Sequence, residues 1–88
     1  MRFDLNAALT AFRYIAHYDS FTRAAAELNV SASALSQTLR HLENHLGVRL
    51  FNRTTRQVRL TETGQVFLQR ITPALTEIDA AIDLLRQN

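Results

Sequence analysis

One segment of the chain, residues 31–46, carries a row of hydrogen-bonding side chains at helical spacing. At about 100° per residue the row lies opposite a leucine stripe. The row contains Ser33, Gln37, Arg40 and Asn44, with Ser36 on its shoulder, and the stripe contains Leu35, Leu39, Leu42 and Leu46. Glutamine can pair with adenine, arginine can pair with guanine, and serine can reach a base or a phosphate. The free amides at the helix start, near Ser31, also suit a phosphate oxygen. An ordinary solvated face is usually richer in Glu and Lys, so this pattern favours contact with DNA.

A second group of arginines follows in a short polar segment, residues 53–56. Val48 and Leu50 before it, and residues 57–60 after it, show the alternation typical of strands, so we predict a two-stranded antiparallel hairpin. We expect Val48 and Leu50 to point the same way, with Phe51 as a further candidate. The hairpin tip holds Arg53, Thr54, Thr55 and Arg56. Such a tip can lie along the DNA backbone or insert arginine into a narrow minor groove, although an ordinary solvated hairpin end is the alternative.

Charge is concentrated in the same part of the chain. The chain has 10 basic and 8 acidic residues. Residues 28–60 hold five arginines against one acid, Glu43, and the chain contains no lysine. Because the guanidinium fork matches phosphate and guanine edges, this arginine cluster is compatible with an anionic polymer as the partner, although charge alone favours an ordinary solvated charged face.

Metal binding and catalysis find little support in the sequence. His41 and His45 have a metal-ligand spacing, but Glu43 is not adjacent to the first histidine, as the zinc protease motif requires, and no third ligand accompanies them. Gly47 and Gly64 stand alone, so no phosphate-binding loop is present. No nucleophile–base pair is evident either. We therefore expect no metal, no cofactor and no enzymatic activity.

The polar row needs a helical scaffold, and the periodicity supplies one. Leu5, Leu9, Phe12 and Ala16 predict a first helix, capped by Asp4 or Asn6 and broken at 17–20. We predict a short second helix over 21–28, capped by Ser20 or Thr22, then a three-residue turn and a third helix closed by Gly47. This order and spacing are those of a helix-turn-helix. The fold class is mostly α: a winged helix-turn-helix with a three-helix core and a two-stranded wing.

A long last helix, capped by Thr61, carries a different apolar pattern. Its spacing alternates between three and four residues over Leu68, Ile71, Leu75, Ile78, Ile82 and Leu85. This is a heptad seam of under three repeats, which supports a helix pair rather than a long coiled coil. We expect a DNA-binding unit over 1–61 and a linker helix for dimerisation over 62–88. A seam that reaches the last residues is typical of a fragment of a longer protein or of a dimer interface.

Composition excludes several other classes of protein. The chain has 88 residues, 2 Gly, 1 Pro and 0 Cys, which argues against a disulfide scaffold or a Cys-ligated zinc site. No uncharged apolar run approaches the roughly 20 residues of a membrane span. Asp4 and Asn6 stand where a secretory signal would need apolar residues, so we expect an intracellular domain without a membrane partner.

Several motifs together resemble the N-terminal DNA-binding domain of LysR-type transcriptional regulators. They are Ser20-Phe21-Thr22-Arg23-Ala24-Ala25, Leu28-Asn29-Val30-Ser31, Ser33-Ala34-Leu35-Ser36, Leu42-Glu43, Leu46-Gly47-Val48-Arg49-Leu50-Phe51, Arg53-Thr54-Thr55-Arg56, Leu60-Thr61 and Gly64. The resemblance runs in order and without gaps from Leu5 to about Leu85 and is highly specific.

The resemblance implies a bacterial, cytoplasmic regulator, nucleoid-associated when bound, that acts as a dimer on double-stranded DNA. It further implies antiparallel pairing of the linker helix and a C-terminal domain, absent from this chain, that binds a small-molecule effector. By position, the residues that reach DNA would be Ser31, Ala32, Ser33, Ser36, Gln37, Arg53 and Arg56, and the sequence pattern adds Arg40 and Thr54.

Two departures from the family pattern bear on base preference. The family commonly has Gln where this chain has Ala32, and often Arg or Lys where it has Gln37. Both changes shorten or neutralise groove contacts, so the operator sequence does not carry over from the family. A rival interpretation is a winged helix used only for protein association through its heptad seam.

Overall fold

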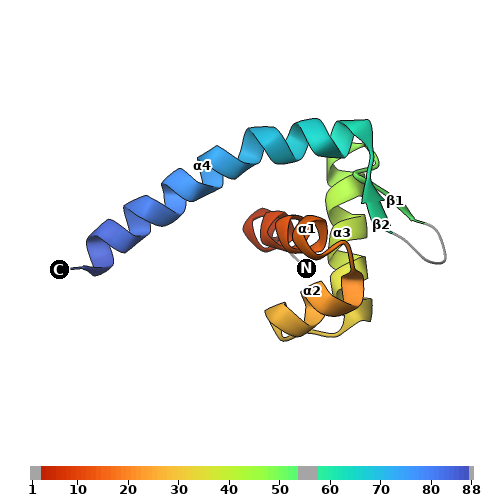
Figure 1. The fold of residues 1–88 in the computed structure, drawn as a ribbon, viewed down its shortest axis with the longest axis horizontal. Coiled ribbons are helices and arrows are strands. Elements are labelled where there is room, and N and C mark those ends of the chain that lie inside the picture. Colours follow the sequence, from red (N-terminus) through yellow and green to blue (C-terminus); the bar gives the residue numbers. More distant parts are fainter. Residues whose placement is uncertain (1–2, 54–57, 88) are drawn as a thin grey trace.

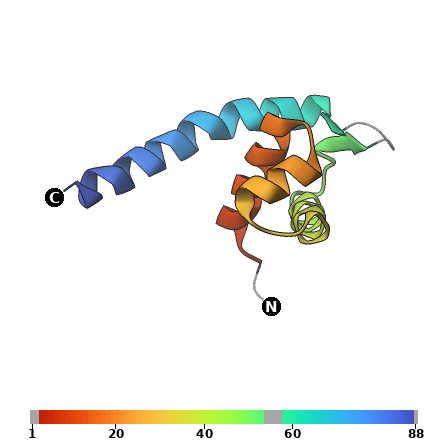
Figure 2. The same cartoon turned by 60° about the horizontal axis from the view of Figure 1, so that its bottom comes forward.

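The computed structural model describes residues 3–53 and 58–87, which form a helical body with one long projecting helix (Figure 1). The elements are α1 (Leu5–Tyr18), α2 (Phe21–Leu28), α3 (Ala32–Leu46), β1 (Phe51–Arg53), β2 (Val58–Leu60) and α4 (Glu62–Arg86). Helices α1, α2 and α3 pack on one another, and the hairpin and the start of α4 lie at one end of this body (Figures 1 and 2). The predicted mostly helical winged helix-turn-helix is confirmed.

Each helix begins at a short polar side chain that accepts a hydrogen bond from the first turn. The caps are Asp4, Ser20, Ser31 and Thr61, with distances of 3.1, 3.1, 3.0 and 2.9 Å to the amides of Ala7, Arg23, Ala34 and Gly64. Since the first amides of a helix have no partner within it, such a side chain fixes where the helix starts. Of the alternatives that the sequence left open, Asp4 and Ser20 are the ones used.

The turn between α2 and α3 is held by a left-handed residue. Asn29 has φ 59° and ψ 43°, a conformation that asparagine tolerates better than most side chains. The amide of Val30 then donates to the Ala25 carbonyl over 3.0 Å, which closes the end of α2. Gly47, with φ 74°, ends α3 in the same way, as its position in the sequence predicts.

The first helix differs from its predicted form at both its end and its buried face. It continues through Tyr18 and stops at Asp19, which adopts φ 53°, so the break expected at 17–20 was placed too early. Its buried residues are Ala8, Ala11, Phe12 and Ile15, whereas Leu5 is 44% exposed. The buried face is rotated toward the alanines because their small side chains let α2 and α3 approach closely.

The hydrophobic core lies between the three helices and the base of the wing. Its largest fully buried side chains are Phe12, Ile15, Leu39, Leu42, Leu50 and Phe51. The ring of Phe12 lies 5.5 Å from that of Phe51 and 5.4 Å from that of Phe67 on α4. One aromatic residue of α1 therefore joins the wing and the last helix to the helical body.

The wing is a short antiparallel hairpin in which Phe51 pairs with Leu60 and Arg53 with Val58. The wing begins at Phe51, later than predicted, so Val48 and Leu50 both lie before β1. Val48 is 39% exposed whereas Leu50 is fully buried, so the two side chains do not point the same way. Leu46 is 36% exposed, unlike the other three leucines of the α3 stripe, because the last turn of α3 extends beyond the core. The predicted tip residues Thr54, Thr55 and Arg56 lie outside the described residues.

Helix α4 is anchored to the segment that precedes the wing. The Thr61 hydroxyl donates to the Arg49 carbonyl over 2.7 Å, and the Thr61 amide donates to the Leu50 carbonyl over 2.9 Å. Gly64 lies so close to the Leu50 carbonyl that a Cβ would overlap it. Helix α4 then leaves the body (Figures 1 and 2). Within the described part of the chain, no helix is long and apolar enough to cross a membrane.

Candidate nucleic-acid interface

The outer face of α3 presents the polar row that the sequence predicts. Ser31, Ser33, Gln37, Arg40 and Asn44 are all exposed, while Leu35, Leu39 and Leu42 on the opposite side are buried. The exposed face of α3 therefore combines amide, hydroxyl and guanidinium groups without a carboxylate. Because the helix is held by its leucines against α1 and α2, these groups are presented on a rigid element.

Two of the predicted contact residues lie partly inside the body instead. Ala32 and Ser36 are half-buried, and Ala32 packs against the hydrophobic core. Ala32 stands in the first turn of α3, next to the cap Ser31. Its small side chain leaves the neighbouring amides accessible to a phosphate oxygen, and these amides are the groups through which this turn can act.

A buried carboxylate connects α3 to the wing. Glu43 is 6% exposed, and its Oε2 accepts from the amides of Leu50 and Phe51 over 2.8 and 3.3 Å. Its Oε1 accepts from Nη2 of Arg53 over 2.9 Å. These three donors satisfy the buried charge, and they come from the residues on which the wing begins. Glu43 thus fixes the direction in which the wing leaves the body.

Arg53 has a structural role in addition to the contact predicted for it. Its guanidinium lies 5.4 Å from the ring centroid of Phe21 on α2, as well as against Glu43, and its side chain is 24% exposed. Its Nε is buried and has no hydrogen-bond partner within the described residues. Arg53 thus ties β1 to α2 and α3, and only part of its guanidinium is presented to the outside.

The structural role of Glu43 was not predicted from the sequence, although a signal was present. Glu43 is the only acid among the five arginines of residues 28–60. By helical geometry it lies only about 70° from the centre of the leucine stripe, on the edge of the buried face. An isolated acid at such an edge indicates a carboxylate with local partners.

A basic cleft of about 500 Å³ lies between the second half of α3 and the start of the wing. Its lining includes Arg40, Asn44, Arg49 and Arg53. Arg40 and Arg49 are exposed, so their charges remain accessible beside the paired Arg53. Arg49 belongs to the basic cluster recognised in the sequence, but it is not among the residues predicted to contact DNA. The cleft extends the basic surface from the polar row of α3 toward the wing.

The histidine pair of α3 does not form the beginning of a metal centre in the described part of the chain. No group of three or more metal-ligating side chains occurs within residues 3–53 and 58–87. The ring of His45 instead stacks on Phe3, with centroids 4.8 Å apart. One of the two histidines thus has an aromatic neighbour that accounts for its position.

The apolar seam of α4 is covered over its first half and uncovered over its second. Leu68, Ile71 and Leu75 are half-buried, and the first two pack against the core. Ile78, Ile82 and Leu85 are 51%, 43% and 76% exposed. Three large apolar side chains in a row on an exposed helix are typical of an interface with another chain.

Comparison with known proteins places this architecture in a family. Residues 7–65 match the family model described as bacterial regulatory helix-turn-helix protein, lysR family. The chain belongs to the LysR family. Among the LysR-family relatives, the transcriptional regulator PgrR of Escherichia coli K12 is 50% identical over 76 residues, which cover 86% of this chain and 25% of the regulator. The carbapenem-hydrolyzing beta-lactamase transcriptional activator of Enterobacter cloacae is 48% identical over 82 residues, covering 93% of this chain and 28% of the activator.

Solved structures of LysR-family proteins agree with the fold. The BenM DNA-binding domain in complex with benA site 1 DNA superposes with a TM-score of 0.85 at 29% identity and covers 99% of this chain and 94% of that domain. Vibrio fischeri DarR in complex with DNA gives a TM-score of 0.84 at 28% identity, over 99% of this chain and 30% of DarR. Membership of the LysR family confirms the predicted helix-turn-helix DNA-binding domain and the expectation that the chain is not an enzyme. The chain spans about a quarter of the length of the curated relatives it matches.

Proposed function

We propose that this chain binds double-stranded DNA sequence-specifically as the DNA-binding domain of a bacterial LysR-type transcriptional regulator. The observation that carries the proposal is the exposed, carboxylate-free face of α3, opposite leucines that hold the helix on the body. An α-helix fits the major groove of B-DNA, and glutamine and arginine on its outer face can read base edges there. The DNA complexes of BenM and DarR support this use of the same fold.

The contacts divide into two classes by the position of each residue. Side chains along the exposed face of α3 read bases, with Gln37 and Arg40 able to form two hydrogen bonds each. The amides and hydroxyls at the start of α3, together with Arg49 of the basic cleft, bind phosphate. The wing lies on the backbone or in the minor groove. The proposed contact set is Ser31, Ala32, Ser33, Ser36, Gln37, Arg40, Arg53, Thr54 and Arg56, to which the cleft adds Arg49.

A second copy of the chain pairs along α4. In this proposal residues 1–61 contact DNA and residues 62–88 form the linker helix, although the first turns of α4 also pack on the body. Residues 63–76 contain no acid, whereas Glu77, Asp79 and Asp83 follow without an intervening base. Antiparallel pairing places each acidic half beside an acid-free half, while parallel pairing would set the carboxylates side by side. The two-fold axis then spaces the recognition helices by about one turn of DNA or a multiple of it.

The regulator as a whole extends beyond this domain. The curated relatives are about four times as long as the matched segment. We infer an additional domain that binds a small-molecule effector, and action on chromosomal DNA in the bacterial cytoplasm. The dimer would then connect two effector domains to two recognition helices.

Fluorescence anisotropy tests DNA binding directly. The chain is titrated into the intergenic DNA beside its own gene and into a scrambled duplex of the same length, at two salt concentrations. We expect tighter binding to the native fragment and an affinity that falls steeply with salt, because arginines displace counterions from phosphates.

Two substitutions separate base contacts from phosphate contacts. Gln37→Ala should narrow the difference between native and scrambled DNA, whereas Arg49→Ala should weaken both alike and flatten the salt dependence. Equal loss on both duplexes from both variants would contradict this division. No binding to either duplex at low salt would contradict the proposal and favour a module that serves only protein association.

A further inference from the structure

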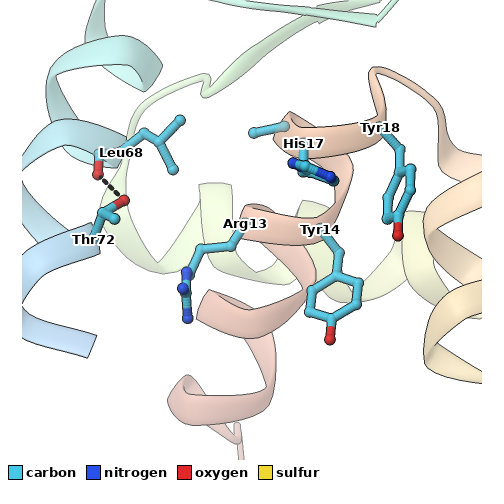
Figure 3. A pocket seen from close by; sticks show the side chains of 7 residues that line it. Arg13, Tyr14, His17, Tyr18, Leu68 and Thr72 are labelled. Atoms are coloured by element: carbon cyan, nitrogen blue, oxygen red, sulfur yellow. Dashed lines mark hydrogen bonds between the residues drawn. The ribbon is translucent and has the colours of Figure 1, made fainter. Parts of the chain in front are cut away.

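A groove of about 430 Å³ separates α1 from α4 on the side of the body where the long helix departs (Figure 3). From α1 it is lined by Arg13 and His17, which stand one helical turn apart, together with two tyrosines. From α4 it is lined by Leu68, a member of the apolar seam, and by Thr72. The groove is thus continuous with the seam on one wall and carries basic side chains on the other.

The basic wall has no acidic partner within the described residues. Figure 3 shows Arg13 extending from α1 into the space beside α4. The one ion pair formed among residues 3–53 and 58–87 joins Glu43 to Arg53, so no described carboxylate pairs with Arg13. Arg13 is half-buried, and its charge is therefore less fully solvated than that of a surface arginine.

The second half of α4 carries the complementary charge at the matching spacing. Asp79 and Asp83 stand one turn apart on α4, and both are exposed. On a helical wheel whose seam runs through Leu68, Ile71 and Leu75, the two aspartates lie on the flank that also contains Thr72. Glu77 lies on the opposite flank. Two acids one turn apart can therefore face two basic residues one turn apart.

The register of an antiparallel pair brings these groups to the same level. When two seams are aligned about their middle, Leu68 of one copy lies opposite Leu85 of the other, and Ile71 lies opposite Ile82. The segment around Asp83 of the second copy then lies between the levels of Leu68 and Thr72, where the groove is. In antiparallel pairs a flank faces the same flank of the other helix, so Asp79 and Asp83 turn toward α1.

We propose that the groove between α1 and α4 receives the acidic end of α4 from a second copy, with Arg13 and His17 facing Asp79 and Asp83. This inference rests on the dimer of the proposed function and specifies how that dimer is oriented. It makes α1 part of the dimer interface, in addition to the apolar seam. Because the dimer is two-fold symmetric, each charge contact occurs twice.

Charge reversal followed by mixing tests the contact. The two reversed chains are Arg13→Glu and the double variant Asp79→Arg/Asp83→Arg, and the control is Glu77→Arg on the opposite flank of the same helix. Sedimentation equilibrium should show that each reversed chain dimerises at least about tenfold more weakly than the wild type, since attraction becomes repulsion at two symmetric sites. The control should stay within about threefold, because it changes only a solvated charge.

Mixing the two reversed chains provides the decisive measurement. In the mixed dimer Glu at position 13 faces the two new arginines, and the native Arg13 faces the native aspartates, so both contacts are restored. We expect the heterodimer to form with an affinity close to that of the wild type, which also shows that both variants are folded.

Three results would overturn the inference, and they differ in whether they also refute the dimer of the proposed function. A wild-type dimer that is indifferent to both reversals, or reversed chains that do not recover on mixing, would refute the groove contact alone. A wild-type chain that remains monomeric would refute the dimer as well. None of these results depends on DNA, so binding to the duplex in the anisotropy experiment is judged independently.

Discussion

Replacing Glu43 by glutamine tests how the wing is held. The substitution keeps the shape of the side chain and one oxygen that can accept from the amides of Leu50 and Phe51, since both donate to the same oxygen. The other oxygen, which accepts from Arg53 over 2.9 Å, becomes an amide group that points a donor at a donor. The change thus removes one charge-assisted hydrogen bond and leaves the guanidinium facing an N–H group.

The expected loss follows from the burial of the two partners. Hydrogen bonds to charged groups contribute about 1.5–3 kcal/mol, and Glu43 is almost fully buried while Arg53 is 24% exposed. We therefore expect Glu43→Gln to lower the free energy of unfolding by about 2–3 kcal/mol. For a domain of this size, that corresponds to a fall in Tm of roughly 10–20 °C.

Thermal and urea unfolding followed by circular dichroism would measure this loss. Glu77→Gln, the same substitution at an exposed site, should leave Tm nearly unchanged. A double-mutant cycle with Arg53→Met isolates the pair, and we expect a coupling energy of about 2 kcal/mol. A coupling energy below about 0.5 kcal/mol would refute the assignment of Glu43 and Arg53 as the ion pair that fixes the wing to α3.

Three further pairs of substitutions distinguish roles that the structure assigns to neighbouring or similar residues. Gly64→Ala should destabilise the domain by about 3 kcal/mol or more, because the new Cβ overlaps the Leu50 carbonyl. Gly47→Ala should cost only about 1 kcal/mol, because alanine disfavours the positive φ of this residue. Equal shifts in Tm for the two variants would contradict the close approach of α4 to Leu50. Ser31→Ala and Ser20→Ala should each lower the stability by about 1 kcal/mol, because each removes a helix cap. Only Ser31→Ala should weaken DNA binding in the anisotropy titration, and weaker binding by both variants would argue against a phosphate contact at the start of α3. Ile82→Ala should raise the dimer dissociation constant at least about tenfold, while Val66→Ala, which truncates an exposed side chain outside the seam, should leave it unchanged. Equal dissociation constants for the two variants in sedimentation would show that the seam is not part of the interface.

Much of the fold follows from local signals that tertiary packing does not change. Ser31 and Gly47 mark the limits of α3 because a cap and a left-handed residue act within one turn of the chain. Thr61 starts α4 for the same reason. The alternation of apolar and polar residues after Arg56 likewise predicted β2, which needs only a neighbouring strand to pair with.

The departures arise where distant segments decide the outcome. The burial of Ile15 rather than Leu5 depends on how closely the alanines of α1 let the other helices approach, and periodicity alone cannot choose between neighbouring faces. The exposure of Val48 depends on where the chain turns to form the wing. The partners of Glu43 lie seven to ten residues away, across a turn, so their contact with the carboxylate is a property of the tertiary structure.

The hydrogen bonds of Thr61 fix the orientation of α4 relative to the helical body, so a rotation at the start of α4 displaces its far end. The hydroxyl and amide of Thr61 join the start of α4 to Arg49 and Leu50, and the same short segment is held to α3 by Glu43. Helices α4 and α3 are therefore expected to turn as one body. The 25 residues of α4 span about 38 Å. A tilt of 5° about one end would displace the other by about 3 Å, close to the roughly 3.4 Å rise of one base pair. In the proposed dimer, a change of a few degrees in the angle between the paired linker helices would therefore shift the spacing of the two α3 helices along the DNA by about one base pair.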